Sequence, residues 1–136
     1  MADLTITATN VVPVQAGHAF EDGIAGATIT AGQAVVLNSA NLWVLADADN
    51  VCYVTDKFGV AENGAAANQT IRVQVGGKIA IGGTVAIGQV HAVSTTAGGI
   101  AAIADLTTGK YIILLGIGVS VTEILLGIKP SGVAKA

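Results

Sequence analysis

Hydrophobic residues recur along this chain in short runs, and clusters of Gly, Asn, Asp and Ser separate one run from the next. In the run Thr70–Val75, Ile71 and Val73 alternate with Arg72, so the two hydrophobic side chains share one side of a strand. The spacing of about 3.6 residues that marks an amphipathic helix is missing. The pattern therefore predicts an all-β chain. The expected strands are Leu4–Ala8, Ala34–Asn38, Leu42–Ala46, Lys57–Ala61, Thr70–Val75, Lys78–Ile81, Val90–Ser94, Gly99–Ile103, Lys110–Val119 and Glu123–Ile128.

The length of 136 residues suits one domain with its own hydrophobic core. We expect residues 1–24 to form an N-terminal arm and loop, and residues 25–136 to form a single β domain. At most one short helix is expected, as a single turn in the alanine-rich segment Gly64–Gln69.

An internal repeat runs through the β domain and covers residues 28–47 and 84–105. Thr28–Gln33 aligns with Thr84–Gln89, and each copy reads as a turn, a strand, a loop and a second strand. A third, partial copy of the turn lies just before the run Thr70–Val75. The repeat predicts that the same local structure is used three times.

Each copy of the turn holds one residue for which a positive φ is expected, namely Gly32, Asn68 or Gly88. The residues three and five positions further along share one side of the strand that follows, so they are expected to face the core. These residues are Val35 and Leu37, Ile71 and Val73, and His91 and Val93.

The N-terminal segment Ala2–Val14 has no counterpart in the repeat. Its first hydrophobic residues alternate with threonines, and Pro13 ends any strand ladder. A short β-prone arm can pair with a strand edge of another chain, whereas an edge strand of the same barrel is an equally good interpretation. The residues expected to contact another chain at such an interface are Leu4, Ile6, Val11 and Val12.

Composition limits the partners that the chain can bind. Hydrophobic residues make up 52% and charged residues 11% of the sequence, so some apolar surface is expected to be covered by self-association. The net charge is −3, and the six Lys and Arg residues are not clustered. A surface that holds phosphates is therefore not expected, which argues against direct binding of nucleic acid.

A calcium loop is suggested by the sequence Asp47–Asn50, but Val51 and Phe58 stand where an EF-hand needs a ligand and its final Glu. A different cation site built on Asp47, Asp49 and Asp56 is the alternative, and a solvated loop fits the same residues better.

Other reactive residues are isolated. Cys52 is the single cysteine and is expected to be buried, while His18 and His91 lie on separate segments without a third metal ligand. His91 is expected to be a hydrogen-bonded histidine at the boundary of the core. The sequence thus predicts no catalytic site, no cofactor and no metal.

The most hydrophobic segment, Tyr111–Ile128, is interrupted by Ser120, Thr122 and Glu123, so it fits two short buried strands better than a membrane span. The N-terminus lacks the basic and apolar regions of a signal peptide, which predicts folding in the cytoplasm.

Three segments carry a family resemblance: ATITAGQAVVLNSANLWVLADAD, FGVAENGAAANQTIRVQVGGKIAIG and VSTTAGGIAAIADLTTGKYIILLGIG. They resemble the small decoration, or head cement, proteins of tailed bacteriophage capsids, and the resemblance extends over roughly residues 25–128. The resemblance implies a compact β barrel or β-tulip-like domain that binds the major capsid protein on the outside of the virion, often as a homotrimer, and stabilises the head. It also implies synthesis in the cytoplasm of a bacterial host. Asn68 departs from the glycine of the other two turns.

A second functional hypothesis is a non-catalytic β module of a tail-fibre or cell-surface assembly, with carbohydrate as a candidate ligand. Sugar sites usually need exposed aromatic platforms, and aromatic residues make up only 4% of this chain. The capsid hypothesis is therefore preferred.

Replacing Ile71 with alanine should lower the free energy of unfolding by about 2–5 kcal/mol, because the substitution leaves a cavity in the predicted core. Denaturation by urea measures this change. An exposed Ile71 beside a buried Arg72 would instead show that the register is wrong by one residue.

Overall fold

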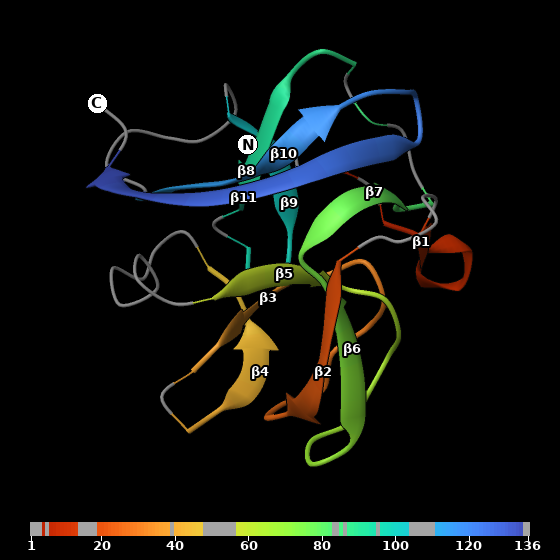
Figure 1. Cartoon of the computed structure of the whole chain (residues 1–136), viewed down its shortest axis with the longest axis vertical. Coiled ribbons are helices and arrows are strands. Elements are labelled where there is room, and N and C mark those ends of the chain that lie inside the picture. The colour runs from red at the N-terminus through yellow and green to blue at the C-terminus, as the bar shows by residue number, and fades with distance from the viewer. Residues whose placement is uncertain are drawn as a thin grey trace.

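The computed structural model describes residues 4, 6–13, 19–38, 40–47, 57–82, 85, 87–94, 96–103 and 111–134. Its strands confirm the predicted all-β class (Figure 1). They are β1 Val12–Pro13, β2 Phe20–Ala25, β3 Ala34–Leu37, β4 Leu42–Leu45, β5 Phe58–Ala61, β6 Thr70–Gln74, β7 Gly76–Ala80, β8 Val90–Val93, β9 Ile100–Ala102, β10 Tyr111–Gly118 and β11 Glu123–Ala134.

The strands form two sheets that are stacked in Figure 1, with the barrel in the lower half and an open sheet in the upper half. The barrel is closed and has the order β2-β4-β3-β5-β6, in which β2 and β4 are parallel. The second sheet has the order β1-β7-β11-β10-β8-β9 and its paired strands are antiparallel. The predicted barrel is therefore present, and a six-stranded sheet accompanies it.

Strand β2 was not expected from the sequence, because its large hydrophobic residues point outward. Phe20 and Ile24 are exposed, whereas Gly23 lies against the indole of Trp43, which fills the barrel and is 1% exposed. A Cβ on Gly23 would lie 2.6 Å from Trp43 Nε1. The inward-facing residues Gly23 and Ala25 are thus small, whereas the large hydrophobic residues face outward, which reverses the usual pattern of a half-buried strand.

Two hydrophobic clusters result from this arrangement. The barrel interior contains Ala25, Ile29, Val35, Trp43, Ala61, Ala65, Ile71 and Val73, and Leu37, Leu45 and Val75 pack against it. A larger cluster lies between the barrel and the six-stranded sheet and includes Val36, Phe58, Val60, Ile79, Ile113, Leu115 and Ile124. Strands β3 and β5 contribute to both clusters, since Val35 faces the barrel interior while Val36 faces the sheet.

The expected core is confirmed with one correction. Val35, Ile71 and Val73 are fully buried in the barrel with Leu37 packed against them, and Arg72 is exposed as the register requires. Val93 is also buried, but it belongs to the cluster between the two sheets. The cause is that the second copy of the repeat forms the β8–β9 hairpin of the open sheet, whereas the first copy forms the β3–β4 hairpin of the barrel.

The three turns of the repeat are confirmed. Gly32, Asn68 and Gly88 have φ values of 89°, 71° and 77°. In the first turn the Gln33 side chain accepts a hydrogen bond from the Thr30 backbone N–H at 2.9 Å, and the corresponding bond in the Asn68 turn is 2.8 Å long. The glutamine therefore closes the turn that precedes β3 and the turn that precedes β6, which explains its recurrence in these two copies.

The helical turn expected at Gly64–Gln69 is wrong. Ala65 forms an isolated bridge with Ile29, and the residues after it form the second copy of the repeated turn. The short helix of the described chain is instead a single 3-10 turn, η1, at Ala8–Asn10.

The strand expected at Leu4–Ala8 is also wrong, and the segment contacts its own chain. The Leu4 N–H donates to the Ile100 carbonyl at 2.7 Å and the Thr7 N–H donates to the Ile81 carbonyl at 3.0 Å. The segment thus contacts both β9 and the end of β7, and β1 then pairs with β7. The arm was expected to extend to residue 24, but β2 begins at Phe20. Residues 20–24 are therefore part of the barrel.

Replacing Gly23 with alanine should destabilise the fold by about 1–3 kcal/mol, because the new methyl group would overlap with the Trp43 indole. Gly127 is the matched control: it also lies in a strand, and a Cβ there would meet nothing within 4 Å. The midpoints of urea denaturation compare the two variants. Equal stability of the two alanine variants would contradict the packing of Trp43 against β2.

Candidate interaction surface

The side of the six-stranded sheet that points away from the barrel is rich in hydrophobic residues. In β11, Ile124 and Leu126 are buried in the cluster between the sheets, so Glu123 and Leu125 lie on the opposite side. The same alternation in β7 places Lys78 and Ala80 with them, because Ile79 is buried. We call this side the outer face and define it by Val12, Lys78, Ala80, Val90, Ile117, Val119, Glu123 and Leu125.

Strand register arranges the outer face in two rows. In one row, Lys78 is paired with Leu125, Leu125 with Ile117, and Ile117 with Val90. In the other row, Val12 and Glu123 are both paired with Ala80, and the Val119 N–H donates to the Glu123 carbonyl at 3.1 Å. The eight side chains therefore form a continuous surface across five strands.

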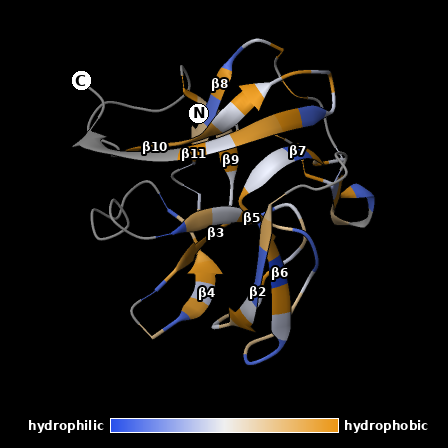
Figure 2. Cartoon of the chain, in the orientation of Figure 1, coloured by the Kyte–Doolittle hydropathy of each residue, from blue (hydrophilic) through white to orange (hydrophobic). Residues whose placement is uncertain are grey.

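Most of the exposed large hydrophobic residues of the described chain belong to this face or to its rim. Ile117 is 46% exposed, Leu125 is 42% exposed and Val119 is 39% exposed. Val121, in the turn between β10 and β11, and Ile87, which bridges to Gly118, add to the same end of the sheet. Figure 2 shows hydrophobic colouring along β10 and the neighbouring part of β11.

The exposure of this face was not expected, because the sequence of Tyr111–Ile128 predicts two buried strands. Only one face of each strand is buried, as Ile117 and Leu125 show. The available signal was a nearly unbroken hydrophobic run, in which residues of both parities are apolar.

Of the four residues expected at an interface, three are at least partly buried in their own chain. Leu4 and Ile6 pack against the cluster between the sheets, and Val11 is 7% exposed. Val12 is 51% exposed and belongs to the outer face. Contact of this segment with another chain stays a prediction, and Val12 is the side chain best placed to make it.

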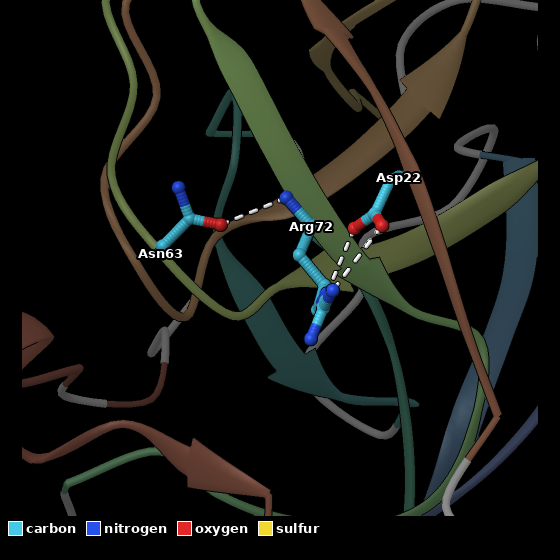
Figure 3. A network of polar contacts seen from close by, with 3 residues as sticks. All are labelled: Asp22, Asn63 and Arg72. Atoms are coloured by element: carbon cyan, nitrogen blue, oxygen red, sulfur yellow. Dashed lines mark hydrogen bonds and ion pairs between the residues drawn. The ribbon is translucent and has the colours of Figure 1, made fainter.

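A second exposed surface lies on β2 and β6 of the barrel (Figure 3). The Arg72 guanidinium donates to both carboxylate oxygens of Asp22, at 2.8 and 3.2 Å, and lies 4.1 Å from the centre of the Phe20 ring. The Asn63 side chain accepts a hydrogen bond from the Arg72 backbone N–H at 2.7 Å. The hydrogen bond from Arg72 lowers the pKa of Asp22. This network joins β2 to β6. Because Arg72 and Asp22 are already paired with each other, they leave little free charge for a ligand.

His91 faces the core as the repeat predicts, but the expected hydrogen-bonded position at the boundary of the core is wrong. Its side chain is fully buried in β8, opposite Gly116 of β10 and Ala102 of β9. Among the described residues, neither ring nitrogen has a hydrogen-bond partner of good geometry. Burial lowers the pKa of His91, an effect that the Gln89 backbone opposes. The neutral imidazole is therefore the form that the fold accommodates.

The other candidate residues do not form a site in the described part of the chain. Within those ranges, no group of three or more His, Cys, Asp and Glu residues could hold a metal ion. Asp47 is described, whereas His18, Asp49, Cys52 and Asp56 lie outside the described residues. None of the described helical segments is long and apolar enough to cross a membrane.

Comparisons with known proteins add no family assignment, because no protein-family model and no curated protein sequence matches the chain.

The stability of the protein should fall as the pH drops below about 6.5, because the unfolded chain then takes up a proton at His91 that the folded chain binds only at lower pH. The contribution of one histidine reaches at most about 1.4 kcal/mol per pH unit. A His91→Leu variant removes this contribution while keeping a side chain of similar size.

Urea denaturation of both proteins between about pH 7.5 and pH 5 tests the prediction, since carboxylates titrate in both and cancel in the comparison. The loss of stability should be smaller in the variant. The same pH dependence in both proteins would contradict it.

Proposed function

We propose that this chain is a structural protein that binds other protein chains, and that the assembly it joins is the outer surface of a phage head. The observation that carries the proposal is the outer face, a hydrophobic sheet surface of a kind that usually marks contact with another protein. Its two charged residues, Lys78 and Glu123, are of opposite sign, so the face does not favour a polyanion such as nucleic acid.

The resemblance to capsid decoration proteins supports the more specific part of the proposal. Two of the segments that carry it include structural elements of the barrel: ATITAGQAVVLNSANLWVLADAD includes β3 and β4, and FGVAENGAAANQTIRVQVGGKIAIG includes β5 and β6. A closed barrel has no free strand edges, and such a rigid body suits a protein that must reinforce a shell. The partner under this proposal is the major capsid protein, and the location is the exterior of the virion.

Carbohydrate binding has less support. Among the described aromatic side chains, Trp43 and Phe58 are buried and Phe20 is exposed beside Arg72. A single ring that already contacts a guanidinium is a poor platform for a sugar.

Sedimentation with phage heads tests the proposed function. The probe is the empty head of the phage that encodes the chain, stripped of its surface proteins, and the matched control is the same head with those proteins retained. We expect saturable binding of the purified protein to stripped heads and little binding to the control, because the control sites are occupied. Failure to sediment with stripped heads over the full range of protein concentration would overturn the capsid proposal.

A further inference from the structure

We infer that copies of this chain associate through the outer face, with Lys78 of one copy beside Glu123 of another. This inference concerns the protein in solution, so it does not depend on the proposed attachment to a capsid.

The need for a covering layer follows from the two sides of β10 and β11. Leu115 and Ile124 are buried toward the barrel, while Ile117, Val119 and Leu125 are exposed on the other side. An antiparallel sheet with one side in water normally places polar residues there. A sheet that is hydrophobic on both sides is instead typical of an inner layer, so the outer face requires a partner.

Charge complementarity identifies the partner as a second copy. Lys78 and Glu123 lie on adjacent strands in neighbouring rows of the outer face, and no ion pair is formed by either side chain among the described residues. A copy of the same face carries the same two charges at the same spacing. It therefore supplies a carboxylate for Lys78 and an ammonium group for Glu123, as a self-complementary interface requires.

The shape of the face also suits a close approach. Gly127 follows Leu125 by two residues on the same side of β11 and carries no side chain. A Cβ on Gly127 would meet nothing within 4 Å, which leaves room for side chains of a neighbouring copy.

The size of the face sets the expected strength of association. Five strands about 4.8 Å apart span roughly 20 Å across the sheet, and the two rows of alternate residues lie roughly 7 Å apart along the strands. The face therefore covers an area on the order of 300 Å², which is less than the surface of about 800 Å² per partner that a standard interface buries. Self-association should therefore be concentration-dependent and measurable by sedimentation equilibrium from about 1 µM to about 1 mM.

The first test replaces Leu125 with serine, and Ile24→Ser is its matched control. The two aliphatic side chains are 42% and 40% exposed, but Ile24 lies on the barrel. We expect Leu125→Ser to raise the dissociation constant of the oligomer by about tenfold or more and Ile24→Ser to leave it unchanged.

The second test exchanges the charges. Lys78→Glu and Glu123→Lys should each weaken association, because each places like charges opposite one another. The double variant should restore association, because the pair is then reversed but still complementary. Circular dichroism establishes that each variant is folded before its mass is measured.

A protein that stays monomeric at the highest concentration would overturn the inference, and so would an oligomer that Leu125→Ser leaves intact. If the double variant does not recover, the pairing of Lys78 with Glu123 is wrong. A monomer whose binding to stripped heads is abolished by Leu125→Ser would assign the outer face to the capsid instead, which would refute self-association while supporting the proposed function.

Discussion

Strands β3 and β5 are buried on both sides, and the rest of the structure is arranged around this constraint. Val35 and Ala61 face the barrel interior, whereas Val36 and Val60 face the six-stranded sheet. Two strands therefore serve two hydrophobic clusters at once. Because apolar burial is the main favourable term in folding, neither layer can lose its neighbour without exposing these side chains to water. The barrel and the sheet are expected to fold as one cooperative unit.

Backbone contacts fix how the two layers meet. Gly98, in the turn between β8 and β9, donates to the Ala46 carbonyl at 2.8 Å and accepts from the Ala34 N–H at 2.9 Å, so a loop of the sheet is bonded to two strands of the barrel. Its φ is 80°, and a Cβ would lie 3.0 Å from Leu45 Cδ2, which explains why glycine is used. A second contact joins β6 of the barrel to β7 of the open sheet. The buried Gln74 amide in β6 donates to the carbonyls of Gly76 and Lys78 in β7. These polar contacts orient the hydrophobic layers.

Local patterns in the sequence predicted much of the fold, while long-range packing did not follow from them. The alternation in Thr70–Val75 and the repeated turns were sufficient for β6 and for the positive φ of Asn68, because both depend on neighbouring residues. Strand β2 was missed because its inward-facing residues are small, and the space left for Gly23 is limited by the distant Trp43. The separation of Val93 from Val35 likewise depends on which sheet each hairpin joins, and a repeat in sequence does not specify this.

The candidate surface was harder to predict than the fold for a related physical reason. A hydrophobic run such as that of β10 and β11 has the same sequence pattern in two cases. The strand can be covered on both sides by its own chain, or on one side by another chain. Only the placement of β7, β10 and β11 against the barrel shows that Ile117 and Leu125 lie on the side of the sheet that faces away from it and are partly exposed. In a chain with 11% charged residues, few charged side chains are available for the surface, and the outer face carries two of them, Lys78 and Glu123. Part of the excess of hydrophobic residues in the composition thus has a location, which is the outer face.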